Sequence, residues 1–479
     1  MIMRSKNIIS WGLALGLLTL IGCQTNKELP KLQKEQLPTE FLNRSASLET
    51  DTSANLAELS YRDFFSDEQL VALIDSGLQR NNNMLVAVKQ IESAQETLKQ
   101  MKWGYLPTAD LSIGAASINR PSNNSMNGMM ASQFMGKSYM EDYSSTLSIS
   151  WEADIWGKIK NQKAGALAAY LSQKEAANAV RTGLIAGIAQ GYYNLLLFDQ
   201  QKIISQQNLA IVDSTLHITK VQQRLGLSNS LAVQQMENSR DNLLKSIRII
   251  AENTAIQENA LSALVGKLPA LQTGRGSLLA LKERTVFGTG VPAAMLSRRP
   301  DIKAAEYAFL QTVSDVKVSR ANMYPALRIT AQGGLNSFTS SNWFNIPGSL
   351  FGMVSGSLTQ PLLQGRRLKT ALNQAVIRSE QAELQFKEAV LQAASEVSTT
   401  MEQIASLQDQ QRYNDQLVER NRQLIQQAKI LFRNDMATYL EVLAAQQSKL
   451  QAELDQMQVK SKMLYAEVAL YKALGGGLN

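Results

Sequence analysis

The chain has 479 residues, a net charge of +7 at neutral pH, one cysteine and one histidine. The single imidazole of His217 excludes any site that needs two, and the sequence holds no glycine-rich phosphate loop, paired-cysteine metal motif or nucleophile elbow. We therefore expect no enzyme, no metal site and no cofactor. His217 itself is expected on a solvated helix surface.

Residues 1–22 are typical of a secretory signal peptide, because Arg4 and Lys6 precede a short apolar stretch. The letters LIGC at its end resemble the bacterial lipobox, in which the signal is cut before a cysteine that becomes lipidated. Cys23 is the only cysteine, so acylation explains it better than redox chemistry. The alternative is a buried thiol in an uncleaved anchor.

The residue after Cys23 is Gln24 and not aspartate, which in lipoproteins implies export to the outer membrane. Loss of Arg4 and Lys6 lowers the net charge to +5, which gives no reason to expect a nucleic-acid partner. No later run of about 18 apolar residues could form a transmembrane helix, so a crossing would have to use strands. Residues 23–60 lack a strong period and are expected to form a lipidated, extended segment.

Two long stretches of the chain contain no proline, one between Pro121 and Pro269 and one after Pro361. Both are rich in Ala, Gln, Leu, Glu and Lys, which favour helices. The spacing predicts long helices over 158–225 and 366–433, each about 100 Å long. Such rods must pack along partners in a coiled-coil-like way.

The two halves of the sequence predict an internal duplication. YLPTADLSIGAAS from Tyr105 matches MYPALRITAQGGL from Met323, and RLGLSNSLAVQQ from Arg224 matches FRNDMATYLEVLAAQQ from Phe432. Each half should contain a helix, two strands, a very long helix, a break and another helix. The predicted division is a first repeat over 61–270, an equatorial linker over 271–299 and a second repeat over 300–479, with the final helices over 229–265 and 437–474.

The predicted strands cover 108–118, 144–155, 326–335 and 350–361. In the first, Leu111 alternates with Asp110 and Ser112, and the next two alternate in the same way, as membrane barrel strands do. A soluble sheet with one core face is the alternative. Aromatic residues gather where strands should meet helices, as an interfacial girdle requires: Trp103, Tyr105, Trp151, Trp156 and Tyr324.

Four strands cannot close a barrel, and open edges are excluded in lipid, so the chain must oligomerise in order to span a membrane. Two copies would give eight strands around a filled interior. Three would give twelve strands and room for a water-filled lumen.

The duplicated unit, the lipobox and three motifs resemble the TolC-like outer-membrane efflux protein family, in its lipid-anchored branch. The motifs are RRPDIKAAEYAF at 298–309, ANMYPALRIT at 321–330 and YLEVLAAQ at 439–446. The resemblance implies a mainly α protein with a membrane β-barrel, a homotrimer whose twelve-strand barrel continues into a periplasmic helical tube. It also implies a passive exit duct for drugs or other small molecules, fed by an inner-membrane pump through a periplasmic adaptor protein.

Other functions remain open at this point. Type I protein secretion and Cu(I) or Ag(I) export would use the same kind of duct. A periplasmic coiled-coil adaptor would carry an all-β segment instead of the duplicated strand pairs. A lipid-anchored enzyme would need a catalytic constellation, and none is visible.

The resemblance places both helix breaks at the periplasmic mouth, as adaptor docking tips. The alternative is that they are ordinary hairpin turns without a docking role. We expect Gly226 and Asn434 to end helices in the left-handed conformation, and Ser228, Asp435 and Thr438 to cap the next ones. The predicted tips are Arg224, Gly226, Leu227, Ser228 and Asn229 in the first repeat, and Arg433, Asn434, Asp435, Met436 and Ala437 in the second.

Relatives of this family carry two acidic residues three apart at the constriction, which fall here on Glu441 and Ala444, so one acidic ring would survive. We predict an apolar iris from Leu440 and Leu443, with Glu441 selecting for cations. A surface-solvated Glu441 is the alternative. A cross-subunit latch known in some members would fall on Phe432, Ala232 and Ala437 and is therefore absent.

Residues 125–140 hold five methionines between the first two strands. Thioethers suit Cu(I) and Ag(I), so contact with these metals is one interpretation of the loop. A flexible loop that plugs the barrel mouth is the favoured alternative.

Overall fold

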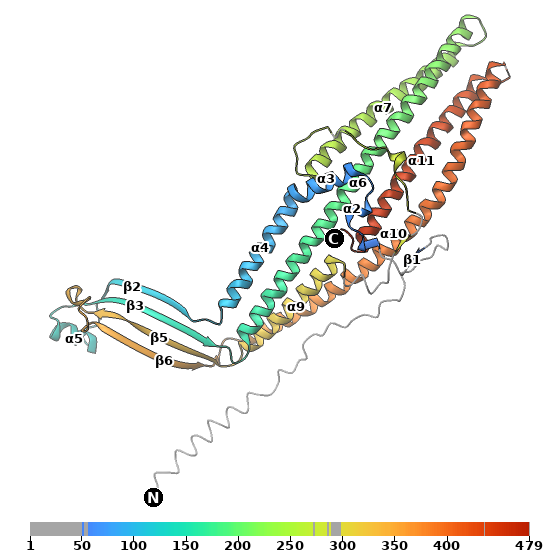
Figure 1. Cartoon of the computed structure of the whole chain (residues 1–479). Helices are drawn as coiled ribbons and strands as arrows, with labels where there is room; N and C mark the ends of the chain where they lie inside the picture. The colour runs from blue at the N-terminus through green and yellow to red at the C-terminus, as the bar shows by residue number, and fades with distance from the viewer. Residues whose placement is uncertain are drawn as a thin grey trace.

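The computed structural model describes residues 50–51, 56–271, 274–284, 287–288, 298–434 and 436–478. The predicted signal peptide, Cys23 and Asp435 lie outside the described residues. The molecule is elongated, with a sheet at one end and long helices at the other (Figure 1). Among the described residues, no helix combines the length and the hydropathy needed to cross a membrane.

The two halves of the chain contain the same elements in the same order, as the duplication predicts. Their first helices, α4 and α9, each have 22 residues, their long helices, α6 and α10, each have 67, and their last helices, α7 and α11, each have 35. In the first half the bounds are α4 Asn82–Trp103, β2 Thr108–Asn119, β3 Met140–Ala153, α6 Lys158–Arg224 and α7 Ser230–Leu264. In the second half they are α9 Pro300–Ala321, β5 Ala326–Ser337, β6 Leu350–Thr359, α10 Arg367–Arg433 and α11 Tyr439–Ala473.

Shorter elements connect and surround these. They are β1 Thr50–Asp51, η1 Leu56–Glu58, α2 Tyr61–Phe64, α3 Glu68–Arg80, α5 Met126–Phe134, η2 Leu278–Ala280, β4 Phe287–Gly288 and η3 Ser340–Asn342. β1 and β4 pair in parallel as a small two-stranded sheet.

The larger sheet is antiparallel, with the order β2-β3-β5-β6, so β2 and β6 are its edges. β3 begins four residues before the predicted start at 144, because Met140 pairs with Asn119 at the far end of the ladder. It ends two residues early, because Asp154 turns to accept hydrogen bonds from the amides of Ile159 and Lys160 at the start of α6. β6 ends at Thr359 and not at 361, since the side chain of Gln360 turns back to the carbonyl of Met323.

The long helices pack with the spacing of a coiled coil. Buried positions on α10 recur at steps of three and four, which keeps one narrow stripe against α11 and α9. They include Val390, Ala393, Val397, Thr400, Ile404 and Leu407, then Val418, Asn421, Ile425, Ala428 and Phe432, and the buried Met401 and Ala405 widen the stripe at mid-length. The stripe is interrupted at Gln411. Its side chain instead donates a hydrogen bond to Glu283, in the segment 274–284 between α7 and α9. The predicted coiled-coil-like packing is therefore present within one chain.

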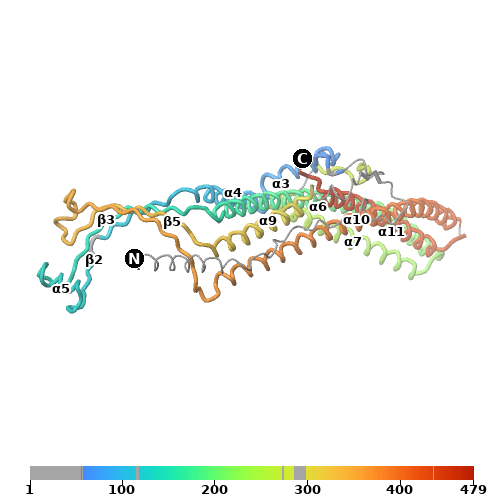
Figure 2. The backbone as a smooth tube through the Cα atoms, turned by 90° about the horizontal axis from the view of Figure 1, so that it is seen from below, coloured from blue at the N-terminus to red at the C-terminus, as the bar shows by residue number. Residues whose placement is uncertain are grey.

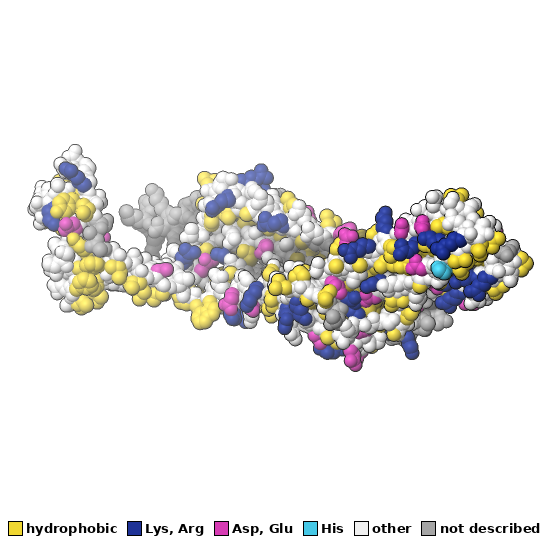
Figure 3. Space-filling model, turned by 90° about the horizontal axis from the view of Figure 1, so that it is seen from above, with side chains coloured by type: hydrophobic (Ala, Val, Ile, Leu, Met, Phe, Trp, Pro, Cys, Tyr) yellow, Lys and Arg dark blue, Asp and Glu magenta, His cyan; other side chains and the backbone are white. Residues whose placement is uncertain are grey.

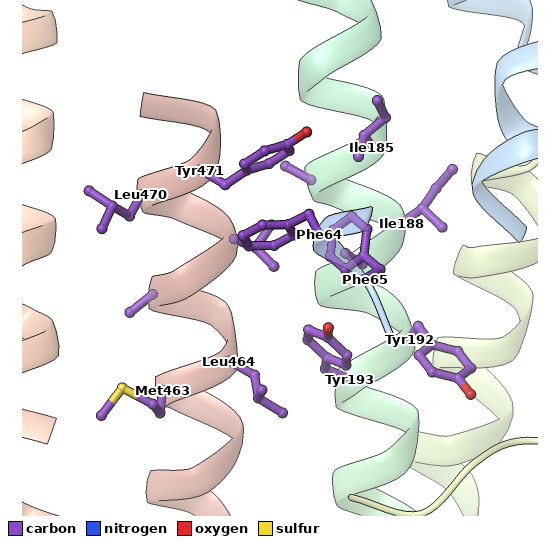
Figure 4. Packing of buried hydrophobic residues seen from close by; sticks show 14 of the residues in the cluster. Phe64, Phe65, Ile185, Ile188, Tyr192, Tyr193, Met463, Leu464, Leu470 and Tyr471 are labelled. Atoms are coloured by element: carbon purple, nitrogen blue, oxygen red, sulfur yellow. The ribbon is translucent and has the colours of Figure 1, made fainter. Parts of the chain in front are cut away.

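The main core lies at mid-length, where α2, α3 and the end of α11 pack on α6. The ring of Phe64 stacks on Tyr471 with centroids 4.1 Å apart (Figure 4). Leu70 and Ile74 of α3 are fully buried. Each fully buried aliphatic side chain contributes about 1.5–3 kcal/mol, so this cluster fixes the two halves against each other. From this belt the hairpins α6–α7 and α10–α11 extend away from the sheet (Figure 1).

Candidate functional site

The first hairpin tip closes with a left-handed glycine, as predicted. Gly226 has φ 73°, its amide donates to the carbonyl of Gln223, and the amide of Leu227 donates to Gln222 at 2.9 Å. These two bonds satisfy the last carbonyls of α6 in a Schellman arrangement. The next helix is capped by Asn229, whose side chain accepts from the amide of Ala232, and not by Ser228 as expected. Ser228 is one residue too early to reach the free amides of the first turn.

The second tip follows the same plan, with one correction. The amide of Met436 donates to the carbonyl of Leu431 at 2.9 Å, which corresponds to the bond from Leu227 in the first tip. Asn434 has φ −98° and is not left-handed, because it occupies the position of Leu225 and not that of Gly226. Thr438 caps α11 as predicted. Asp435 lies outside the described residues.

Each tip presents apolar side chains to solvent close to one exposed arginine. Leu227 is 71% exposed and Met436 is 67% exposed, and both Arg224 and Arg433 are exposed. Leu225, which the sequence analysis did not select, is 68% exposed. Its position next to Gly226 in a helix-ending turn was the signal that could have identified it.

Glu441, the predicted cation-selecting residue, forms a capping box with Thr438. Its carboxylate accepts from the backbone amide of Thr438 at 2.7 Å, while the Thr438 hydroxyl also bonds to it. The hydrogen bond from the Thr438 side chain is the main reason why the pKa of Glu441 lies below its ordinary value. The exposed carboxylate therefore stays charged while it caps the helix.

Only some of the residues predicted to form the constriction are exposed on the surface of α11. Leu440 is 51% exposed, and both Glu441 and Ala444 are exposed. Leu443 is partly buried and packs against the cluster of Val212, Leu216, Val233, Met236 and Leu243 on α6 and α7. Leu443 thus fills space between the two hairpins of one chain.

Polar contacts join the two hairpins near the tips, and the sequence analysis missed them. The phenol of Tyr439 donates to Gln235 at 2.7 Å, and the amide of Gln446 donates to Thr215 at 2.9 Å. No single-sequence signal could have paired side chains more than 200 positions apart. The three positions of the absent latch contain Phe432, Ala232 and Ala437, of which the first two are buried.

The four-stranded sheet has one apolar and one polar face. Ile149 pairs with Ala331 and Ala331 with Val354, which is 78% exposed. On the other face Ser150 pairs with Thr330 and Thr330 with Ser355. Such exposed apolar side chains on a sheet fit a hydrocarbon environment.

The predicted aromatic residues do gather where the sheet meets the helices. Trp156 stacks on Tyr324 with centroids 4.8 Å apart and donates to the carbonyl of Pro325. Trp151 donates to the carbonyl of Tyr105 at 2.9 Å. Trp103 is 69% exposed at the end of α4.

Comparison with known proteins decides the family. The family model described as "Outer membrane efflux protein" matches residues 73–267 and 291–476. The chain belongs to the outer membrane efflux protein family. As a member, it is an outer-membrane efflux channel.

Curated relatives of this efflux channel match over nearly their whole length. The toluene efflux pump outer membrane protein TtgF of Pseudomonas putida is 25% identical over 467 residues, which cover 96% of this chain and 95% of that protein. The cation efflux system protein CusC of Escherichia coli is 26% identical over 472 residues, covering 96% and 97%.

Solved structures share the fold. The outer-membrane channel OprN superposes with a TM-score of 0.84 at 21% identity, covering 94% of this chain and 98% of that one. A CusC structure superposes with a TM-score of 0.79 at 24% identity, covering 94% and 100%. The predicted combination of a barrel sheet and a helical tube is therefore confirmed.

Proposed function

We propose that three copies of the chain assemble into one channel. Their sheets would close a twelve-stranded barrel in the outer membrane, and their helices would form the periplasmic tube. One observation carries this proposal: the sheet exposes an apolar face but leaves β2 and β6 as open edges. Unpaired backbone groups are too costly in lipid, so each edge needs a strand from another copy.

The hairpin tips would receive the periplasmic adaptor protein, which connects the channel to an inner-membrane pump. Support comes from the exposed Leu225, Leu227 and Met436, which are flanked by Arg224 and Arg433. Exposed apolar side chains beside charged ones are typical of docking surfaces. A lipid on Cys23 would add an anchor in the outer membrane.

The transported compounds are proposed to be drugs or other small molecules, which the pump selects. Cu(I) or Ag(I) is the second candidate, since five methionines lie in residues 125–140 and a relative is named for cation efflux. The similarity to TtgF and to CusC is nearly equal and does not separate these two classes.

The assembly is tested on membranes from cells that produce the full chain. We expect outer-membrane fractions to contain a species that migrates as a trimer without heating and as a monomer after heating. The purified species should conduct ions in planar bilayers. A monomer in the soluble periplasmic fraction, with no conductance, would overturn the proposal.

Docking at the tips is tested separately. Leu227→Asp and Met436→Asp, each made alone, should abolish the drug resistance that the channel confers and its chemical cross-linking to the adaptor. The trimer should remain intact in both variants. Tyr413→Asp, at a 62% exposed position on the shaft of α10, is the matched control and should behave as wild type. Resistance that survives both tip substitutions would refute the docking role.

A further inference from the structure

The short helix α5, between β2 and β3, carries an unpartnered apolar stripe. Met126, Met129, Met130 and Phe134 are spaced on one helical face and are 78%, 49%, 42% and 83% exposed. The opposite face is fixed: Gly128 and Ala131 are buried, and a β-carbon on Gly128 would lie 2.1 Å from the carbonyl oxygen of Ser122. The stripe is thus held outward by close packing behind it.

A second apolar surface lies in the connection between β5 and β6. Phe344 is 67% exposed and Ile346 is 66% exposed. Trp343, beside them, contacts Tyr143 of β3 with ring centroids 5.6 Å apart, and buried Ser349 bonds back to the carbonyl of Asn345. These contacts hold the connection in place and leave Ile346 and Phe344 largely exposed, with one side of the Phe344 ring against Trp343 at a centroid distance of 4.8 Å.

The two apolar surfaces lie apart within one chain and would meet between copies. Within one chain the connection 338–349 and α5 both lie at the end of the sheet far from the helices, but they diverge to opposite sides (Figure 2). Hydrophobic side chains are visible on the surface at this end of the molecule, among uncharged and charged ones (Figure 3). When β6 of one copy pairs with β2 of the next, the connection that precedes β6 lies beside the α5 that follows β2.

The composition of both surfaces suits this contact. Residues 126–134 and 338–349 contain no charged side chain. Apolar burial between them would therefore require no desolvation of ions, which is the main penalty at such contacts. An uncharged apolar stripe facing water alone would be unfavourable.

We infer that the apolar stripe of α5 packs against Phe344 and Ile346 of the neighbouring copy, which makes a subunit contact at the outer rim of the barrel. Three such contacts would surround the mouth of the channel. This inference rests on the proposed trimer. It adds a second interface between neighbouring subunits, outside the hydrogen-bonded strands, that stabilises the trimer.

Disulfide trapping tests the contact, because Cys23 is the only native cysteine. In intact cells the double variant Met129→Cys with Phe344→Cys should give covalent dimers and trimers on heated, non-reducing gels. Each single variant should stay monomeric. The matched control pairs Met129→Cys with Leu106→Cys, which is 51% exposed before β2 at the other end of the sheet, and should not cross-link.

Failure of this inference is distinguishable from failure of the trimer. An intact unheated trimer without cross-links in the double variant would overturn the rim contact alone. Absence of any trimer in the wild type would overturn the proposed assembly.

Two further double variants, made in the protein that carries Met129→Cys and Phe344→Cys, distinguish apolar packing from metal binding by the methionine thioethers. Met126→Leu with Met130→Leu keeps the apolar surface and should leave cross-linking unchanged, whereas Met130→Lys with Phe134→Ser should reduce it at least fivefold. Lost tolerance to Ag(I) in the leucine variant, with cross-linking also lost, would overturn the contact in favour of a metal site.

Discussion

The phenol of Tyr439, in the first turn of α11, donates a hydrogen bond to the side chain of Gln235 on α7, 2.7 Å away. This bond joins the two hairpins of one chain close to their tips. It lies near the predicted constriction and connects two parts of the chain that otherwise diverge towards their ends (Figure 1). A change in the separation of the hairpins has to break it.

Removal of the Tyr439 hydroxyl should loosen the tips. A side-chain hydrogen bond contributes about 1 kcal/mol, so Tyr439→Phe should speed amide exchange roughly fivefold in the first turns of α7 and α11. Hydrogen–deuterium exchange of the purified protein measures this. Tyr413→Phe, on an exposed part of α10, is the control. Equal protection in wild type and Tyr439→Phe would show that the bond does not restrain the tips.

The charge of Glu441 should set ion selectivity. Glu441→Gln keeps an oxygen that can cap α11 but removes the carboxylate, so cation preference in planar bilayers should fall while the trimer stays intact. Ala444→Glu would place a second carboxylate one turn away and should increase that preference. Reversal potentials in a salt gradient measure both. The acidic ring is refuted if neither substitution moves the reversal potential.

The buried Arg299 should be far more important for stability than its neighbour Arg298. Arg299 pairs with Asp301 and Glu396 and donates to the carbonyl of Ala473, so it joins α9, α10 and the end of α11. Its loss leaves the carbonyl of the buried Ala473 without this donor, which costs about 1–3 kcal/mol, whereas the carboxylates of Asp301 and Glu396 are 46% and 38% exposed and can be hydrated.

We therefore expect Arg299→Leu to lower the amount of trimer and its dissociation temperature. Arg298→Leu removes only an exposed pair with Glu58, worth at most about 1 kcal/mol, and serves as the control. Equal dissociation temperatures for the two variants would contradict this difference.

The stability of the helical body should depend on pH through Glu467. This side chain is 7% exposed and accepts from the amide of Arg284, and burial raises its pKa from 4.5 to about 7. The folded state therefore holds its proton more tightly than the unfolded chain between these two values. Stability should fall as pH rises from about 4.5 to about 7 and stay level above that.

Glu467→Gln should remove this dependence. At pH 8 it should raise the free energy of unfolding by up to about 3 kcal/mol, at roughly 1.4 kcal/mol per pKa unit. Thermal unfolding followed by circular dichroism at pH 5 and pH 8 measures the change, with Glu388→Gln at an exposed position as the control. If Glu467→Gln keeps the wild-type pH dependence of stability, that dependence belongs to other titratable groups and not to Glu467.

Much of the fold could be predicted from local sequence. Proline positions fixed the two windows for α6 and α10, since proline interrupts a helix wherever it falls inside one. Strand alternation selected the sheet. The ends were less predictable, because Asp154 and Gln360 leave their strands to bond with helices, and such partners are set by tertiary structure.

The site could be predicted only in part. The turn glycine Gly226 is a local signal that predicts the end of α6. The capping box of Thr438 and Glu441 also follows a local four-residue pattern. The placement of Leu443 between the hairpins and the bond from Tyr439 to Gln235 depend on how distant helices pack, which no local pattern contains.

This chain is the outer-membrane exit duct of an efflux system. The most direct measurement is deletion of the chain, followed by a panel of drug and metal susceptibilities and by complementation with the intact chain. We expect increased susceptibility to several small molecules, restored by the intact chain and not by Leu227→Asp with Met436→Asp. Unchanged susceptibility together with the loss of a secreted protein would contradict the account.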